Sequence, residues 1–141
     1  MNITYTNTLT AETYNALRTA VGWQPCEFGR ARTALARSDY LIAAQLEKQV
    51  VGMARVVHDG TVALITDVIV LPEYQGRDIG KTLMEKVMAY LEALAQGGEI
   101  KAHLMSLAGI EPFYEKFGFF VRPQGRYGHG MTKIIRLGED E

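Results

Sequence analysis

Cysteine and proline are scarce in this 141-residue sequence, and neither sign of charge is in excess. The single cysteine, Cys26, excludes an intramolecular disulfide framework and a zinc module held by four cysteines. A formal net charge of −1 and a pI of about 6.3 leave no electrostatic footprint for nucleic acid, so no nucleic-acid partner is expected. No apolar run approaches the ~20 residues of a membrane span, so no membrane partner is expected either.

The first residues also lack the features of a secretory signal peptide. Residues 1–5 contain neither a basic region nor an apolar stretch, and we therefore expect a soluble, cytoplasmic protein. The length predicts one globular domain, 1–141, because domains average roughly 150 residues. A core of that size needs no disulfide or metal to hold it together, and no metal is expected.

Hydrophobic periodicity and turn residues predict alternating strands and helices along the chain. The expected elements are a strand over 3–8, helices over 11–21 and 28–37, strands over 40–46, 50–57 and 61–71, a helix over 79–96, a strand over 100–105, a short helix over 112–117, and closing strands over 119–122 and 131–137. In the strand over 61–71, eight of eleven residues are apolar and they fall on both faces. This pattern predicts a central strand that is covered on both sides.

A glycine-containing turn follows this strand and forms a candidate anion site. The turn, Gln75-Gly76-Arg77-Asp78-Ile79-Gly80-Lys81, opens a helix whose N-terminal N–H groups and dipole favour a phosphate. A tight turn without a ligand is the alternative, and the residue types alone leave both open. A Walker A loop would need glycine at position 75, and a dinucleotide fingerprint would need glycine at positions 78 and 81. ATP hydrolysis and nicotinamide chemistry therefore lose support.

The run from Asp67 to Lys81 resembles the acetyl-CoA motif of the GCN5-related N-acetyltransferase (GNAT) superfamily, Gln/Arg-x-x-Gly-x-Gly/Ala after a valine-rich strand. The run from Phe113 to Phe119 resembles the C-terminal motif of the same superfamily. Together with the element order, the resemblance implies an α+β fold with three α/β/α layers. Its mixed, mostly antiparallel twisted sheet would carry helices on both faces and splayed central strands. Asp78 departs from the pattern, because a glycine usually stands there, and this puts the affinity for the cofactor in doubt.

The resemblance implies direct transfer of an acetyl group from the co-substrate acetyl-CoA to a primary amine. Backbone of the central strand, at Val68, Ile69 and Val70, would align the thioester. The pyrophosphate would be held by Gln75, Gly76, Arg77, Asp78, Ile79, Gly80 and Lys81. Tyr114 matches a tyrosine near the thioester sulfur in many members, and it would protonate the leaving thiolate. Packing of this ring against Phe113 and Phe117 is the alternative reading.

The base that deprotonates the amine is less well defined by the sequence. Asp67 interrupts an apolar strand, and a buried carboxylate needs either a partner or a chemical role. It is a candidate catalytic base, or a structural hydrogen-bond acceptor. His58, next to the Asp59-Gly60 turn, is a second candidate, and a base reached through water would leave no mark. Trp23 and Phe28 form either an aromatic wall for the acceptor or packing between the first two helices.

Three functions remain open at this point. The first is acetylation of a small-molecule amine, which the lack of a charged recognition tail favours. The second is acetylation of a protein lysine or N-terminus, and the third is a non-catalytic CoA-binding sensor. Many relatives are dimers, so a homodimer is one expectation, although these residues do not determine the oligomeric state.

Overall fold

The computed structural model describes residues 2–136 and 138. By its internal contacts the chain divides into two compact units, one ending at Met105 and one beginning at Ser106. The first unit holds the sheet and the long helices. The single domain over residues 1–141 that the length suggests stays a prediction beside this division.

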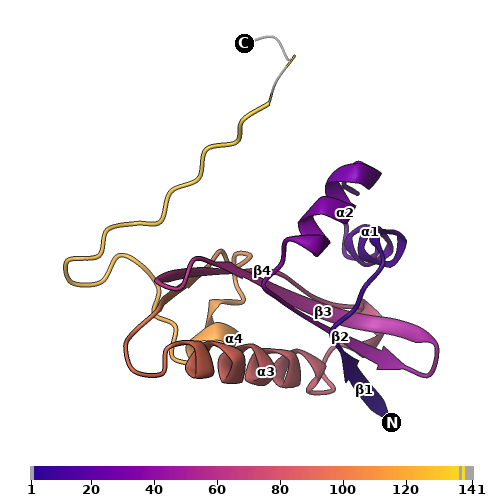
Figure 1. Cartoon of the computed structure of the whole chain (residues 1–141), viewed down its shortest axis with the longest axis horizontal. Coiled ribbons are helices and arrows are strands. Elements are labelled where there is room, and N and C mark those ends of the chain that lie inside the picture. Colours follow the sequence, from indigo (N-terminus) through magenta and orange to yellow (C-terminus); the bar gives the residue numbers. More distant parts are fainter. Residues whose placement is uncertain (1, 137, 139–141) are drawn as a thin grey trace. The chain divides into compact units, whose positions relative to one another are not determined.

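The first unit is built on a five-stranded sheet in the order β1-β2-β3-β4-β5 (Figure 1). Its strands are β1 (Ile3–Thr6), β2 (Tyr40–Leu46), β3 (Gln49–His58), β4 (Val62–Val70) and β5 (Lys101–Leu104). The pairs from β1 to β4 are antiparallel, whereas β4 and β5 are parallel. The predicted mixed, mostly antiparallel α+β fold is confirmed, and β4 lies inside the sheet as expected.

Helices cover both faces of this sheet, as predicted. The helices α1 (Ala11–Ala20) and α2 (Phe28–Ala36) lie on one face, and α3 (Ile79–Leu94) lies on the other (Figure 1). Thr10 begins α1 as its N-cap, because its hydroxyl accepts a hydrogen bond from the N–H of Thr13. A single 3₁₀ turn, η1 (Pro72–Tyr74), separates β4 from the loop that leads into α3.

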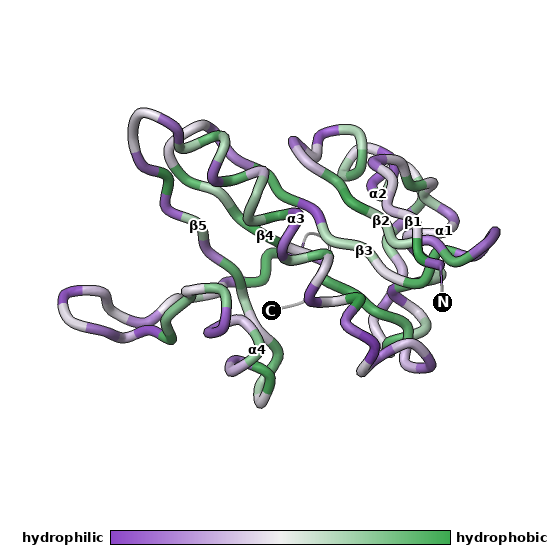
Figure 2. Tube along the Cα trace, turned by 90° about the horizontal axis from the view of Figure 1, so that it is seen from below, coloured by the Kyte–Doolittle hydropathy of each residue, from purple (hydrophilic) through white to green (hydrophobic). Residues whose placement is uncertain are grey.

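The core has one part between α3 and the inner strands and another under α1 on the opposite face, where Tyr14 and Leu17 are buried. α3 contacts β2, β3 and β4. Its buried residues are Ile79, Leu83, Met84, Val87 and Leu91, spaced as a 3.6-residue period requires. Figure 2 shows hydrophobic and hydrophilic stretches alternating along α3, as expected of an amphipathic helix. Burying the apolar stripe of α3 against the sheet is what sets the helix beside β4 and positions its N-terminus.

The prediction that β4 is covered on both faces is wrong for its first residues. Val62 and Leu64 are 46% and 37% exposed, whereas Ala63 and Ile65 are buried. Because side chains alternate along a strand, Val62 and Leu64 share one face and Ala63 and Ile65 the other. The apolar run therefore reflects burial against α3 on one face and only partial cover on the other.

The second unit contains one short helix, α4 (Glu111–Glu115), where a helix over 112–117 was expected. The two closing strands predicted over 119–122 and 131–137 are wrong for the described residues, with residue 137 lying outside them. The only strand-like pairing found there is an isolated bridge between Gln124 and Tyr127. A β-branched, apolar segment becomes a strand only when a partner strand pairs with it, and sequence pattern cannot supply that partner.

Candidate active site

The central strands separate at the place where the resemblance expects a cofactor. β4 pairs with β5 only from Val62 to Ile65, opposite Lys101 to Leu104. β4 then continues to Val70, paired on its other side with β3. From Thr66 onward the edge of β4 that faces away from β3 is therefore left without a strand partner in residues 2–105. This confirms the splayed pair of strands.

A β-bulge lies where β4 leaves β5. Met53 of β3 pairs with Ile69, and Arg55 pairs with Thr66. Asp67 and Val68 together therefore oppose one residue of β3, which is the arrangement of a bulge. Asp67 adopts a left-handed conformation with φ of 54°. A bulge bends and twists its strand, so this feature accounts for the departure of β4 from β5.

Beyond the bulge, the alternation of the strand fixes which backbone groups face the open edge. The N–H of Leu71 donates to the carbonyl of Val51 in β3, at 2.9 Å. Successive N–H groups of a strand point to opposite sides, so Ile69 also faces β3 while Val68 and Val70 face the open edge. Of the three predicted thioester contacts, Val68 and Val70 thus present their N–H groups to the open edge.

The loop between η1 and α3 is tied to the end of β4. The side-chain amide of Gln75 donates to the carbonyl of Val70 at 3.0 Å. Gly76 has a φ of 79°, which glycine adopts without steric cost. The Arg77 guanidinium lies over the ring of Tyr74, 5.6 Å from its centroid. These contacts hold the predicted phosphate loop directly beside the open edge.

The N-terminus of α3 offers backbone donors at the same place. The first hydrogen bond inside the helix runs from Thr82 N–H to the carbonyl of Asp78, at 3.0 Å. The N–H groups of Ile79, Gly80 and Lys81 precede it and have no partner within the helix. Asp78 adopts φ of 63°, and its side chain makes no capping hydrogen bond. Among the residues that the structure describes, α3 therefore begins with unpaired backbone donors, as an anion site requires.

Asp67 is enclosed by a cluster of side chains, which we call the Asp67 cluster: Tyr14, Arg18, Arg55 and Asp67. The Tyr14 hydroxyl donates to one carboxylate oxygen, Oδ2, at 2.6 Å, and Nε of Arg55 donates to the same atom at 2.7 Å. Nη1 of Arg18 lies 3.2 Å from the other oxygen. The Asp67 side chain is only 7% exposed, so both ion pairs are largely shielded from solvent. These contacts favour the structural reading of Asp67 over the catalytic one.

The chemistry of Tyr14 follows from this carboxylate. Burial and, next, the hydrogen bond to Asp67 raise the pKa of Tyr14 from 10.0 to about 12. The hydroxyl therefore stays protonated as a donor throughout the neutral range.

Sequence reasoning missed Tyr14, Arg18 and Arg55. The sequence held two signals for them. Arg55 is a charged residue inside the apolar strand over 50–57, and Tyr14 and Arg18 are four residues apart on one helix face.

His58, the second candidate base, has both ring nitrogens engaged. Its Nδ1 accepts a hydrogen bond from the N–H of Gly60 at 3.0 Å. Nδ1 thus carries no proton in this arrangement, and Nε2 donates to the Tyr90 hydroxyl, 2.8 Å away. Neither nitrogen is free to accept a proton from an amine, so these contacts favour a structural role in joining β3 to α3.

Tyr114, the predicted acid, lies on α4 in the second unit. Its ring makes edge contacts with Phe113 and Phe119, whose centroids lie 5.0 and 6.5 Å away. Burial raises the pKa of the Tyr114 phenol above its ordinary value of 10.0. No hydrogen bond engages its hydroxyl within the described part of the chain. Packing and proton donation are therefore both compatible with its surroundings.

The two aromatic residues expected near the acceptor differ in their surroundings. Trp23 packs under the Arg18 guanidinium, 5.5 Å from the ring centroid, and so borders the Asp67 cluster. Phe28 is 49% exposed and has only the Arg32 guanidinium over it, at 6.0 Å. The packing reading thus fits Trp23 but does not fit Phe28.

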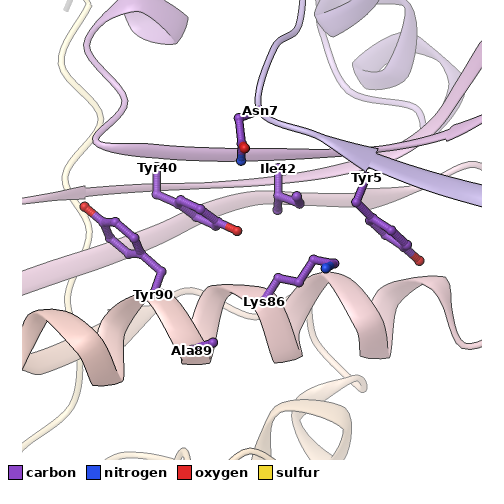
Figure 3. A pocket seen from close by; sticks show the side chains of 7 residues that line it. All are labelled: Tyr5, Asn7, Tyr40, Ile42, Lys86, Ala89 and Tyr90. Atoms are coloured by element: carbon purple, nitrogen blue, oxygen red, sulfur yellow. The ribbon is translucent and has the colours of Figure 1, made fainter.

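A separate recess of about 450 Å³ lies between α3 and the strands β1 and β2 (Figure 3). It is lined by Tyr5, Asn7, Tyr40, Ile42, Lys86, Ala89 and Tyr90. The rings of Tyr40 and Tyr90 stack at 4.5 Å, and the Lys86 ammonium lies over the ring of Tyr5 at 5.1 Å. None of the predicted site residues lines this recess.

Within residues 2–136 and 138, no three His, Cys, Asp or Glu side chains gather in a way that could hold a metal ion. None of the helices in that range combines the length and apolar character that a membrane span needs.

Comparison with known proteins places these features in a family. The Acetyltransferase (GNAT) domain family matches residues 37–121. The "GCN5-related N-acetyltransferase 1, chloroplastic" of Arabidopsis thaliana is 32% identical over 126 residues, covering 87% of this chain and 62% of the relative. The "Histone acetyltransferase TAP1" of Glycine max is 32% identical over 126 residues, covering 80% of this chain and 53% of the relative.

Solved structures agree with the sequence relatives. A protein of unknown function from Staphylococcus aureus, described as a probable acetyltransferase, superposes with a TM-score of 0.84 at 29% identity, covering 95% of this chain and all of that one. The glucosamine-6-phosphate N-acetyltransferase of Arabidopsis thaliana shares the fold, with a TM-score of 0.74 at 17% identity. The chain matches 32% of the length of a second Arabidopsis relative, GCN5-related N-acetyltransferase 2. It thus spans less than two thirds of the curated relatives named here.

Proposed function

We propose that this chain, which belongs to the GNAT superfamily and is an acetyltransferase, transfers an acetyl group from acetyl-CoA to the primary amine of a small molecule. The observation that carries the proposal is the open edge of β4 after Thr66 beside the uncapped N-terminus of α3. Backbone N–H groups at the first place could bind a thioester carbonyl, and those at the second could bind a pyrophosphate.

The residues present fit acetyl-CoA. The free N–H groups of Ile79, Gly80 and Lys81 suit the pyrophosphate, and Lys81 adds a positive charge in the first turn. Val68 and Val70 offer N–H groups along the open edge, where an extended pantetheine arm can pair like a strand. Asp78 opposes this fit, because it adds a negative charge at the residue that precedes α3. When bound, acetyl-CoA supplies the acetyl group as an activated thioester.

Besides the acetyl-CoA site, the reaction needs a proton acceptor for the amine and a proton donor for the thiolate. A protonated amine first loses one proton, because only the neutral amine has a lone pair that can attack. Its nitrogen then forms a bond to the acetyl carbon while the carbon–sulfur bond breaks. The nitrogen loses a second proton, and the thiolate takes up one. Tyr114 is the proposed donor of that proton, since its raised pKa keeps the phenol protonated at neutral pH. Because Asp67 and His58 are both engaged by other groups, we propose that water accepts the two protons of the amine and returns one of them to Tyr114.

The first test is thermal unfolding with saturating acetyl-CoA, with ATP and NAD as controls. A ligand at 100 times its Kd stabilises a protein by about 2.7 kcal/mol, which raises the midpoint of this chain by roughly 5–10 °C. We expect a shift with acetyl-CoA and none with ATP or NAD. A shift with none of the three would contradict the proposed cofactor site.

The second test measures CoA release with a panel of small amines, using Tyr114→Phe and the control Tyr5→Phe. Loss of a general acid lowers kcat by about 100-fold or more, so we expect that loss in Tyr114→Phe with acetyl-CoA binding unchanged. Tyr5→Phe should keep the wild-type kcat. A wild-type protein that binds acetyl-CoA without turnover on any amine, peptides included, would favour the CoA-binding sensor.

Protein acetylation is the second candidate, because the name of one relative describes a histone acetyltransferase. The two candidate functions differ in which acceptor amine the enzyme acetylates most efficiently. Histone H3 and H4 peptides and intact histones should be offered beside the small amines at equal amine concentration. A kcat/KM for a peptide that exceeds every small amine by tenfold would overturn the small-molecule proposal.

A further inference from the structure

The Asp67 carboxylate occupies the one point of β4 where the strand changes course. Asp67 is the bulge residue, and its φ of 54° is costly for any residue other than glycine, although Asp tolerates it better than most. Such a conformation persists only where surrounding contacts over-determine it. Here the contacts are the three side-chain donors of the Asp67 cluster, contributed by α1 and β3.

We infer that Asp67 is a positioning residue, and that the Asp67 cluster holds the bulge that turns the N–H groups of Val68 and Val70 toward the thioester. The inference rests on the proposed function. It assigns Tyr14, Arg18 and Arg55 to the same task, although none of them contacts the acetyl group. Asp67 itself takes no proton from the acceptor.

The hydrogen bonds argue against Asp67 as the base. Oδ2 accepts from Tyr14 and Arg55, and Oδ1 accepts from Arg18. The Arg18 and Arg55 side chains are 20% and 15% exposed, so both ion pairs lie largely away from solvent. A carboxylate whose two oxygens are held by three donors of the fold is poorly placed to accept a proton from an acceptor amine.

The cluster also connects the bulge to the segments on both sides of α2. Nε of Arg18 donates to the carbonyl of Gln24 at 2.8 Å, and its guanidinium lies over Trp23. Nη1 of Arg55 donates to the hydroxyl of Ser38, at 3.3 Å. One carboxylate therefore links α1, the connection to α2 and the residues after α2 to the thioester strand.

Tyr14→Phe, Arg55→Met and Asp67→Asn test the inference, with Glu92→Gln on the exposed side of α3 as the control. Tyr14→Phe removes one hydroxyl only, so it keeps the test decisive if Asp67→Asn fails to fold. Misplacing a reacting group by about 1 Å costs roughly 100-fold in rate, so we expect kcat/KM to fall by about 10- to 100-fold in the three variants. KM for acetyl-CoA should rise and the shape of the pH profile should stay as in the wild type.

Two results would overturn the inference. If Asp67 is the base, Asp67→Asn abolishes the acidic limb of the kcat/KM profile, while Tyr14→Phe only shifts that limb. If the cluster merely stabilises the fold, all three variants lower the unfolding midpoint but keep the wild-type kcat and KM at 25 °C. Glu92→Gln should match the wild type in every measurement.

A readout without acetyl-CoA separates this inference from the proposed function. Amide hydrogen exchange at Ile69 and Leu71, whose N–H groups face β3 just after the bulge, together with fluorescence of Trp23, the only tryptophan, reports on the bulge and the cluster. We expect faster exchange at both amides and altered emission in Tyr14→Phe. If those changes occur but the wild type never binds acetyl-CoA, the proposed function fails while the cluster still holds the bulge. If exchange is unchanged in Tyr14→Phe while the wild type is an active enzyme, the inference fails and the proposed function stands.

Discussion

At the residue scale, the site depends on a few side chains whose surroundings decide their chemistry. Asp67 and Asp78 are both non-glycine residues with positive φ, at 54° and 63°. Asp67 is held by three side-chain donors, whereas the Asp78 side chain caps nothing. The first position is therefore stabilised by its environment, and the second retains both its backbone strain and its negative charge beside the anion site.

Tyr14 gives the protein a stability component that depends on alkaline pH. Its pKa is about 12 in the folded chain and 10.0 when exposed, so the folded state holds the proton more tightly. That stabilisation is complete below pH 10 and is lost as the pH rises from 10 toward 12. Between pH 9 and 11, the gap in unfolding free energy between wild type and Tyr14→Phe should shrink by about 1 kcal/mol. Urea unfolding at both pH values measures it.

Asp78 is expected to weaken acetyl-CoA binding through its charge. Removing one negative charge several ångströms from a pyrophosphate should lower the Kd for acetyl-CoA by about 3- to 10-fold at low salt, and by less at high salt. Asp78→Asn keeps the size and the tolerance for positive φ, so it isolates the charge, whereas Asp78→Gly also relieves the backbone. Calorimetric titration at 20 and 300 mM salt tests this. Equal Kd values for wild type and Asp78→Asn at low salt would mean that the carboxylate points away from the ligand.

At the element scale, the course of β4 is set by two neighbouring elements and by its own bulge. β3 pairs with it on one side, α3 packs on one face, and the bulge bends it away from β5. Gly52 of β3 lies against both β4 and α3. A Cβ at this position would lie 2.9 Å from the carbonyl oxygen of Ile69 and 3.3 Å from Cδ1 of Leu83.

Gly52→Ala should therefore disturb the thioester strand. The added methyl group meets backbone, which cannot move aside as a flexible side chain does. Overpacking of this kind should cost about 1–3 kcal/mol of unfolding free energy and should also raise the Kd for acetyl-CoA. The matched control is Gly98→Ala, because a Cβ at Gly98 meets nothing within 4 Å. Urea unfolding and acetyl-CoA titration check both variants. Indistinguishable results for the two would contradict the role given to the close approach.

At the scale of the whole molecule, the two compact units differ in whether they are large enough to fold alone. Residues 106–141 number 36, and chains below about 40 residues rarely fold without disulfides, metals or a partner. The only cysteine, Cys26, lies outside this range. We therefore expect the second unit to depend on the rest of the chain for its folded state.

If residues 106–141 depend on the rest of the chain, the protein should unfold as a single domain. Calorimetry tests this. One cooperative transition should appear, with the calorimetric enthalpy equal to the van't Hoff enthalpy. Saturating acetyl-CoA should move that transition as a whole. Two transitions, or a ligand shift confined to part of the unfolding enthalpy, would show that the units unfold independently.

Much of this protein follows from its sequence because the signals are local. The 3.6-residue stripe of α3, the threonine that begins α1 and the Asp59-Gly60 turn each act through neighbouring residues. The element order and the motif from Asp67 to Lys81 then sufficed to predict the family and the mixed sheet. The burial of one strand face was overestimated at Val62 and Leu64, since composition does not say how far a helix extends over a sheet.

Only the tertiary structure decided the rest. That Asp67 is bound by Tyr14, Arg18 and Arg55 depends on contacts 53, 49 and 12 residues apart in the chain. That Val68 and Val70, rather than Ile69, face the open edge depends on the register with β3, which a bulge shifts by one residue. The segments over 119–122 and 131–137 have the composition of strands, yet pairing requires a partner. Long-range partners are chosen by packing of the whole chain, and no local pattern encodes that choice.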